Sequence, residues 1–317
     1  MTDRVSSQDK KDASSSSTTA SALARKQTEA VQEALARAWP GIAFEKRLIS
    51  TEGDRTLDRP LPEIGGKGVF TQELEAALRS GQADLAVHSL KDLPIQDPPG
   101  LCIGAVLRRE DPRDVIVSSV GGGLDAINEG SVVGTSSLRR RSQLLASRPD
   151  LRIQSIRGNV GTRIEKVRNG EFDAAILAAA GLLRLGLERE IASWLSLEEM
   201  LPAPGQGAIA VQCRADDQVS LELLAPLDDG PTRAEVEAER EFLVALGGGC
   251  TAPVAANAKY ADRSLTLRGV VASLDGEKVI RVVRSGSDAL ELGQSLAVEA
   301  LALGAQEMIA HANTPRA

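Results

Sequence analysis

The sequence predicts an α/β fold with mixed, mainly parallel sheets, and three observations support this class. From Asp111 onward, apolar segments of strand length alternate with helical segments, and each strand leads through a polar or glycine-containing turn into the next helix. Such alternation is typical of parallel sheets that bind ligands at the carboxyl ends of their strands. The proline- and glycine-rich segment 201–207 has the composition of a connection between domains. Residues 231–317 follow a separate pattern of helix, three strands and helix, which predicts a small C-terminal α/β domain.

The N-terminal region begins with a polar segment that has little apolar surface to bury. Residues 1–20 are rich in serine, and we expect most of them to form a disordered tail. A helix is predicted over 21–37 and a strand over 42–50. A glycine-rich loop then presents Lys67, and Thr71 has the residue type of a helix N-cap.

The next strand is predicted over 84–88, and polar side chains follow it directly. Ser89, Lys91 and Asp92 come at its carboxyl end. Because ligands of open α/β sheets bind at that edge, the charged pair is a functional candidate. From these residues alone, a salt bridge within a loop is an equally good explanation.

Four further strands are predicted before the connection at 201–207, over 115–118, 131–134, 153–156 and 173–178. The second leads through Ser137 into a helix that begins near Leu138. The third leads through residues 157–161 into a helix capped by Thr162. A strand over 208–213 is apolar enough to insert into a sheet.

The C-terminal region begins with a capping box formed by Thr232 and Glu235, which predicts a helix ending near Leu246. Three glycines then leave Cys250 on a backbone free to adopt unusual conformations, so its thiol can project into a cleft and carry a group covalently. The alternative for Cys250 is a small buried thiol. The remaining predicted elements are strands over 253–260, 264–273 and 278–284 and a helix over 287–303.

Composition excludes several classes of protein. The chain has 317 residues, a net charge of −7 and only 2% aromatic residues, which argues against binding to nucleic acid or to a membrane surface. No apolar run approaches the length of a membrane span, and the N-terminus lacks the apolar core of a secretion signal. Three widely spaced cysteines and two histidines fit neither a disulfide framework nor a zinc site. Catalysis is therefore expected from carboxylates, arginines, lysines, hydroxyls or a bound group.

Positive charge is concentrated in residues 139–168. This window holds nine Lys and Arg residues against Asp150 and Glu165, so nine minus two gives +7 within a chain of net charge −7. Several of the arginines flank strand-to-helix turns, where backbone N–H groups already favour anions. Arginine adds a bidentate geometry that suits carboxylate or phosphate. The region therefore predicts a site for a polyanion, although a solvated helix face is the alternative for any single arginine.

Seven motifs, in order along the chain, carry a specific resemblance. They are Gly-Gly-Lys-Gly (65–68), Ala-Val-His-Ser-Leu-Lys-Asp-Leu-Pro (86–94), Arg-Glu-Asp-Pro-Arg-Asp (109–114), Gly-Thr-Ser-Ser-Leu-Arg-Arg (134–140), Arg-Gly-Asn-Val-Gly-Thr-Arg (157–163), Pro-Gly-Gln-Gly (204–207) and Gly-Gly-Cys (248–250). With them the sequence resembles the hydroxymethylbilane synthase family, also called porphobilinogen deaminase. The resemblance extends from about Ser21 to the C-terminus.

The resemblance implies roles for individual residues. Cys250 matches the cysteine that holds one dipyrromethane cofactor per chain through a thioether, and Asp92 matches the catalytic aspartate. Cofactor contacts, in addition to Asp92, are implied for Lys67, Ser89, Lys91, Ser137, Arg139, Arg140, Arg157, Gly158, Arg163 and Arg184. Substrate contacts are implied for Ser21, Arg139, Arg140, Arg157, Arg163 and Arg184.

The resemblance also implies an architecture and a reaction. Two domains similar to periplasmic binding proteins are expected, at 21–107 with 208–227 and at 108–207, followed by a cofactor-bearing domain at 228–317. The family joins four porphobilinogen molecules head to tail, releases ammonia each time and frees the linear tetrapyrrole hydroxymethylbilane. The implied protein is a monomer whose partner is this small substrate, with no metal, nucleic acid or membrane. The missing secretion signal predicts a cytoplasmic location, and a plastid location is the alternative because the Ser/Thr-rich leader weakly resembles a transit peptide.

One departure from the family pattern affects this expectation. Thr19 stands where the family has arginine, and residues 14–18, all serine or threonine, occupy its apolar first strand. This predicts a poorly formed first strand and impaired cofactor assembly or turnover. An inactive paralogue or a non-catalytic anion-binding protein therefore stays open as an alternative at this point.

Overall fold

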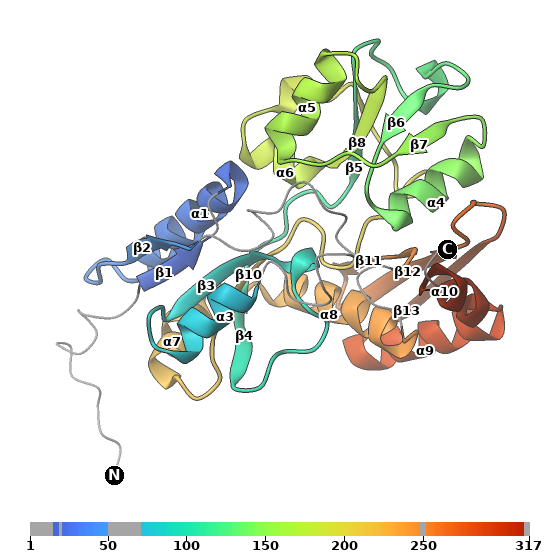
Figure 1. The fold of residues 1–317 in the computed structure, drawn as a ribbon. Coiled ribbons are helices and arrows are strands. Elements are labelled where there is room, and N and C mark those ends of the chain that lie inside the picture. The colour runs from blue at the N-terminus through green and yellow to red at the C-terminus, as the bar shows by residue number, and fades with distance from the viewer. Residues whose placement is uncertain (1–14, 19–20, 50–70, 248–251, 314–317) are drawn as a thin grey trace. The chain divides into compact units, whose positions relative to one another are not determined.

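The chain forms two compact units in a computed structural model that describes residues 15–18, 21–49, 71–247 and 252–313 (Figure 1). Unit 1 contains Met1–Arg108 and Ala208–Gly230, and unit 2 contains Arg109–Gly207 and Pro231–Ala317. The chain therefore passes between the units three times.

Unit 1 is built on a five-stranded sheet in the order β2-β1-β3-β10-β4. Its strands are β1 (Ser15–Thr18), β2 (Glu45–Leu48), β3 (Leu85–Ser89), β4 (Leu101–Val106) and β10 (Ile209–Arg214). The pairs β2-β1 and β1-β3 are parallel, and β10 runs antiparallel to both β3 and β4. The return of the chain after the 201–207 connection therefore places β10 inside the sheet of unit 1, as its apolar sequence predicts.

Helices cover both faces of this sheet because its central strands are apolar on both sides. Leu85 and Val87 of β3 belong to one core cluster, which includes residues of α1 (Ala22–Ala38) and α7 (Gln218–Leu224). Ala86 belongs to a second cluster with residues of α3 (Gln72–Arg79). This is the pattern of an inner strand of an α/β sheet.

The first strand differs from the expectation. Ser15–Thr18 forms β1 and pairs in parallel with both β2 and β3, so residues 15–18 are not part of a disordered tail, and this strand is formed. The physical reason is that the backbone supplies the ladder hydrogen bonds, and both neighbours of β1 are present. Thr19 and the rest of the N-terminal segment lie outside the described residues.

Unit 2 contains a second five-stranded sheet, in the order β7-β6-β8-β5-β9. Its strands are β5 (Asp114–Ser118), β6 (Val132–Gly134), β7 (Arg152–Gln154), β8 (Ala174–Ala178) and β9 (Ser193–Trp194). The pairs β7-β6 and β6-β8 are parallel, and β5 is antiparallel to β8 and β9. The order of parallel and antiparallel pairs is thus the same as in unit 1.

Both faces of this sheet are again covered by helices. One core cluster contains residues of α5 (Val160–Arg168) and α6 (Ala179–Arg184) together with Val115 and Leu177 of the sheet. The cluster on the other face contains Leu144 of α4 (Leu138–Ser147). Successive residues of β5 and β8 therefore point to opposite cores.

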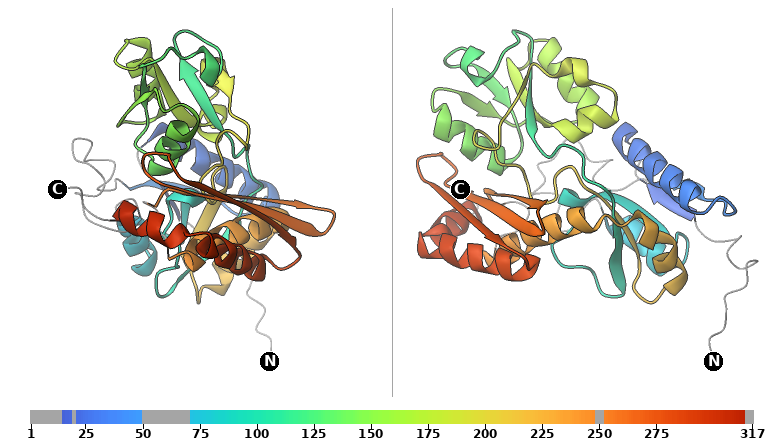
Figure 2. Two further views of the ribbon diagram at one scale, coloured as in Figure 1. Left: turned by 90° about the vertical axis from the view of Figure 1, so that its right-hand side faces the viewer. Right: turned by 180° about the vertical axis from the view of Figure 1, so that it is seen from behind.

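The C-terminal part of unit 2 is an antiparallel sheet of β11 (Val254–Ala261), β12 (Ser264–Ala272) and β13 (Val279–Gly286). The helices packed with it are α8 (Gly230–Ala245), α9 (Ala289–Ala302) and α10 (Ala305–Asn313), and Figure 2 shows α9 and α10 along this sheet. Phe242 of α8 is fully buried at Gly269, where an added Cβ would lie 2.5 Å from the ring. A side chain at 269 would therefore displace the helix.

The predicted fold class is confirmed, and two helix starts are corrected. The class is α/β with two mixed sheets and a smaller C-terminal domain, although parallel and antiparallel pairs are equally frequent in the two five-stranded sheets. Asn159, not Thr162, caps α5, because its side chain accepts from the N–H of Thr162. Helix α8 already begins at Gly230, so Thr232 and Glu235 are not a capping box. The separation of 108–207 from 228–317 stays a prediction, since both lie within unit 2.

Candidate functional site

In unit 1, the predicted catalytic segment lies at the carboxyl end of β3. Residues Leu90–Asp92 form a short 3₁₀ turn, and the N–H of Leu90 donates to the carbonyl of Ala208 at 3.0 Å. Leu90 and Leu93 are buried, so they fix both ends of the turn. Asp92 between them is exposed, and its carboxylate is available to a ligand.

Two further residues of unit 1 belong to the same edge of the sheet. Gln27 of α1 is 3% exposed and donates from Nε2 to the hydroxyl of Ser89 at 2.7 Å. Ser21 is the N-cap of α1 and accepts from the N–H of Ala24 at 3.2 Å. Because β1 and β3 are parallel neighbours, the segments that follow them meet at one sheet edge. Gln27 was missed as a support of Ser89, because the contact joins residues 62 positions apart.

In unit 2, the predicted anion-binding residues follow three neighbouring parallel strands. Ser137, Arg139 and Arg140 follow β6, whereas Arg157, Gly158 and Arg163 follow β7, and Arg184 follows β8. The order β7-β6-β8 brings these segments to one edge of the sheet. The structure therefore brings the turns that hold Ser137, Arg157 and Gly158 to one sheet edge, whereas Arg184 is the last residue of α6.

A serine pair joins the first two of these turns. The hydroxyl of Ser136 lies 2.8 Å from that of Ser155 and donates to the carbonyl of Ile156 at 2.7 Å. Ser137 next to it caps α4 by accepting from the N–H of Arg140 at 3.4 Å. The N-termini of α4 and α5 are thus held at a fixed spacing.

The turn before α5 depends on glycine. Gly158 has φ of 109°, and a Cβ added there would lie 2.7 Å from Cγ2 of Thr162. The carbonyl of Gly158 accepts from Nε of Arg163 at 2.8 Å. Arg157 and Arg163 are both partly exposed, so parts of both side chains can meet a ligand.

Arg139 and Arg140 lie in a different environment from the one that the sequence suggests. They are 5% and 7% exposed, and both donate to the fully buried carboxylate of Asp114, at 2.8 and 2.7 Å. Gln206 also donates to Asp114, at 2.8 Å. Burial by itself would raise the pKa of Asp114, but the charges of Arg139 and Arg140 hold it well below its usual range. Nε of Arg140 is buried without a hydrogen-bond partner.

We name the residues Asp114, Arg139, Arg140 and Gln206 the Asp114 cluster. It contains two guanidinium groups and one carboxylate, so it carries a net charge of +1. Sequence reasoning missed Asp114, although its motif was singled out, because nothing local indicates that it pairs with residues 25 and 26 positions away. A buried net positive charge next to the carboxyl end of β6 favours an anionic ligand there.

Three arginine side chains hold the 201–207 connection by donating hydrogen bonds to its backbone carbonyls. Arg139 donates to the carbonyl of Leu201 at 2.6 Å, Arg109 to that of Gln206 at 2.8 Å and Arg184 to that of Gly207 at 2.6 Å. Arg109 also forms a bidentate pair with the fully buried Glu239, at 2.6 and 3.0 Å. Burial lowers the pKa of Arg184, and Glu110 partly opposes this shift.

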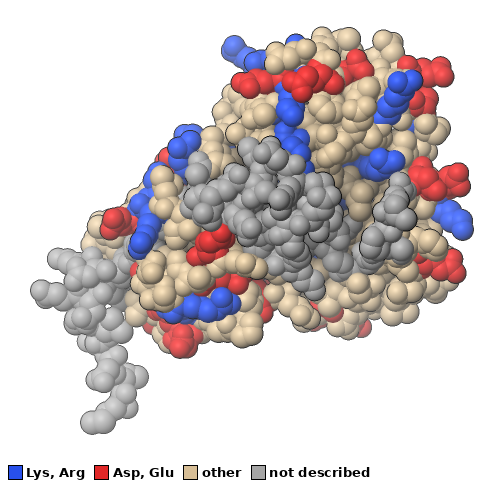
Figure 3. Space-filling view, viewed as in Figure 1, with Lys and Arg blue, Asp and Glu red and all other residues tan. Residues whose placement is uncertain are grey.

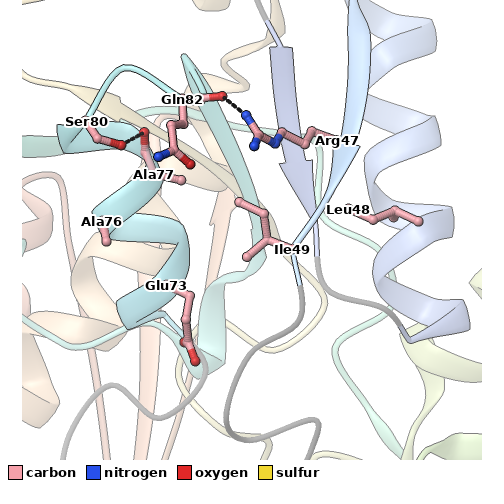
Figure 4. Close-up of a pocket in the computed structure, with 8 residues that line it drawn as sticks. All are labelled: Arg47, Leu48, Ile49, Glu73, Ala76, Ala77, Ser80 and Gln82. Atoms are coloured by element: carbon pink, nitrogen blue, oxygen red, sulfur yellow. Dashed lines mark hydrogen bonds between the residues drawn. The ribbon is translucent and has the colours of Figure 1, made fainter.

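Two predicted site residues cannot be located. Lys67 and Cys250 lie outside the described residues. The hollow drawn in Figure 4 lies in unit 1 between the end of β2 and α3, where Arg47 donates to the carbonyl of Gln82 at 3.1 Å. It contains none of the predicted site residues, so we do not assign the site to it.

Acidic and basic side chains share the surface of the described residues. On the face in Figure 3, Lys and Arg are interspersed with Asp and Glu among the described residues. Within the described part of the chain, no helix combines the length and apolarity needed to cross a membrane. In the same residues, no cluster of three His, Cys, Asp or Glu side chains could hold a metal ion.

Comparison with known proteins identifies the family. A family model described as porphobilinogen deaminase, dipyromethane cofactor binding domain, matches residues 16–222, and one described as porphobilinogen deaminase, C-terminal domain, matches 233–302. The architecture and these matches define a tetrapyrrole-biosynthetic enzyme of the transferase class. The chain belongs to the porphobilinogen deaminase family.

Two bacterial porphobilinogen deaminases are similar in sequence over almost the whole length of this chain. The porphobilinogen deaminase of Syntrophobacter fumaroxidans is 48% identical over 294 residues, which cover 92% of this chain and 95% of the relative. That of Brevibacillus brevis is 50% identical over 291 residues, covering 92% and 94%. Among solved structures, the second substrate binding domain of a putative amino acid ABC transporter from Streptococcus pneumoniae is 13% identical, with a TM-score of 0.42 over 67% of this chain and 90% of that one. At that score the match adds nothing to the fold described above.

Proposed function

We propose that the protein is a working hydroxymethylbilane synthase, which condenses four porphobilinogen molecules head to tail and releases one ammonia for each. The observation that carries this proposal is membership of the family over 16–222 and 233–302, with Asp92 retained at the end of β3. Asp92 and the five arginines predicted between 139 and 184 are all present, which favours the enzyme over an inactive paralogue although Thr19 replaces the family's arginine. The presence of β1 removes one reason for expecting inactivity.

The donor set of unit 2 fits a cofactor that bears carboxylate side chains. Arg157 and Arg163 are partly exposed, the N-termini of α4 and α5 favour anions, and the Asp114 cluster adds a net positive charge. Dipyrromethane, attached through Cys250, would supply the primer to which each monomer is joined. The arginines would hold its acetate and propionate groups, with Lys67, Ser89, Lys91, Ser137 and Gly158 as further contacts.

Asp92 has the chemistry needed to stabilise the reaction. Its exposed carboxylate can accept hydrogen bonds from pyrrole N–H groups and balance the positive charge that develops on those nitrogens. The turn that holds it is fixed through Leu90 and Leu93, so little reorganisation is needed during the reaction. Gln27 orients Ser89 in the same segment.

Replacing Asp92 tests this role. Asp92→Asn should lower the rate of porphobilinogen consumption and ammonia release by about 10²–10³-fold, as when another electrostatic stabiliser is removed. Asp92→Glu should retain part of the activity. Asp97→Asn, at an exposed carboxylate five positions along the same loop, is the matched control and should change little. A wild-type protein that binds porphobilinogen without releasing ammonia would instead be an anion-binding protein.

A monomeric state stays a prediction of the resemblance, and a cytoplasmic location stays a prediction of the missing secretion signal. Sedimentation equilibrium of the purified protein tests the first, and a dimer at micromolar concentration would contradict it. Fractionation of the source cells tests the second.

A further inference from the structure

Two cysteines that the proposed reaction does not use face each other in unit 1. Cys102 of β4 is directly opposite Cys213 of β10, and their Sγ atoms are 3.8 Å apart. Both are free thiols. Cys213 is fully buried in the core shared with α1 and α7, whereas Cys102 is partly exposed at the border of that core.

The backbone geometry of this pair is compatible with a disulfide. Residues directly opposite on antiparallel strands have Cα atoms about 4.5–5.5 Å apart. Disulfides span Cα separations of about 4.4–6.8 Å, so the two sulfurs can bond through small side-chain rotations. The pair lies at the opposite end of β10 from Ile209, which pairs with Ser89 next to the catalytic turn. A bond there would leave the site edge of the sheet in place.

We propose that Cys102 and Cys213 form a thiol oxidation site, which reacts with a small disulfide such as glutathione disulfide to give a cross-strand bond. The thiolate of Cys102 attacks the disulfide, forming a mixed disulfide and releasing one glutathione. The thiolate of Cys213 then attacks the sulfur of Cys102 and releases the second glutathione. The protein loses two electrons and two protons, and the glutathione disulfide is reduced to two glutathione molecules.

Accessibility decides the order of these steps. Cys102 reacts first because it is the more exposed residue of the two, whereas burial raises the pKa of Cys213 to about 12. Little Cys213 thiolate is present at neutral pH, so the second step is the slow one. The mixed disulfide at Cys102 is therefore expected to accumulate before the cross-strand bond forms.

The bond would stabilise unit 1 without entering the reaction. It closes a loop between residues 102 and 213 and joins β10 to β4, the last strand in the order of this sheet. We expect the oxidised protein to unfold at a temperature higher by roughly a few degrees and to keep its activity within about twofold. Reduction should reverse both the bond and the shift.

The test is incubation of the purified holoenzyme with glutathione disulfide, followed by intact mass measurement and peptide mapping without reduction. We expect a transient adduct of one glutathione at Cys102, then loss of two hydrogens and a peptide that links Cys102 to Cys213. In Cys213→Ala the adduct should persist, and in Cys102→Ser neither product should form. A lasting adduct in the wild type, or no reaction at Cys102, would overturn the proposal. Because peptide mapping identifies which cysteines are bonded, the result does not depend on whether Cys250 carries a cofactor.

Discussion

At the scale of single residues, the buried carboxylate of Asp114 organises the polar side chains of unit 2 around it. It accepts hydrogen bonds from Arg139, Arg140 and Gln206 and is itself fully buried. Removing one partner of such a buried pair leaves charge that nothing compensates, at a cost of about 3–5 kcal/mol. Asp114 therefore positions two arginines that are predicted to belong to the site and stabilises unit 2 at the same time.

Asp114→Asn should accordingly lower the free energy of unfolding by about 3–5 kcal/mol, measured by urea denaturation. It should also lower the fraction of chains that carry the cofactor, since both guanidinium groups lose their orientation. Asp111→Asn is the matched control, because Asp111 pairs with Arg113 on a partly exposed surface, at 2.7 Å. Its effect should stay within about 1 kcal/mol. Equal effects of the two substitutions would contradict the role given to Asp114.

The buried imidazole of His88 leads to a prediction about how stability depends on pH. Burial lowers its pKa from 6.5 to about 4, with Gln212 opposing the shift. The folded state then binds fewer protons than the unfolded state between these values, so stability is lost as pH falls from about 6.5 towards 4. The loss attributable to one such group is roughly 3 kcal/mol.

His88→Gln, which cannot titrate, should flatten this part of the stability curve. The measurement is urea denaturation at several pH values between 4 and 7 for both proteins. A parallel decline of the two curves would show that another group is responsible.

At the scale of elements, the turns after the parallel strands of unit 2 hold residues predicted to bind the cofactor, and Gly158 shows that such a turn tolerates little change in sequence. The backbone at Gly158 has a φ of 109°, which residues with a side chain rarely adopt, and an added Cβ would also clash with the side chain of Thr162. Gly158→Ala should therefore destabilise the protein by roughly 1–3 kcal/mol and raise the KM for porphobilinogen.

Gly170 is the matched control for Gly158. It ends α5 with φ of 75°, but a Cβ there has no neighbour within 4 Å. Gly170→Ala should cost some stability and leave the KM unchanged, because it lies at the other end of the helix. Thermal unfolding and steady-state kinetics separate the two effects, and a raised KM in both variants would contradict the assignment.

The first strand leads to a prediction about Thr19. Because β1 forms with serine and threonine alone, any loss of function should come from the missing arginine and not from a missing strand. Thr19→Arg should raise cofactor occupancy or turnover several-fold while leaving thermal stability unchanged. Identical occupancy and turnover in both proteins would show that position 19 is not limiting.

Much of this arrangement could be predicted from the sequence, and particular residues show where prediction fails. Apolar runs such as 174–178 identify strands, and Ser137 identifies the start of α4. The serine strand β1 was missed because its stability comes from backbone pairing with its neighbours. The environment of Arg139 and Arg140 was missed because Asp114 is distant in sequence.

At the scale of the whole molecule, two units repeat one plan. Each has a five-stranded sheet in which three parallel strands are followed in the order by antiparallel ones. Predicted site residues follow all three parallel strands in unit 2, and β1 and β3 in unit 1. Asp92, the predicted catalytic residue, belongs to unit 1, and the arginines predicted between 139 and 184 belong to unit 2.

The most direct test of this account is the mass of the purified protein. We predict that the intact chain weighs more than its sequence by one dipyrromethane, that peptide mapping finds the excess on Cys250, and that Cys250→Ser lacks both the excess and the release of ammonia from porphobilinogen. An unmodified thiol at position 250, in protein that remains inactive after incubation with porphobilinogen, would contradict the account.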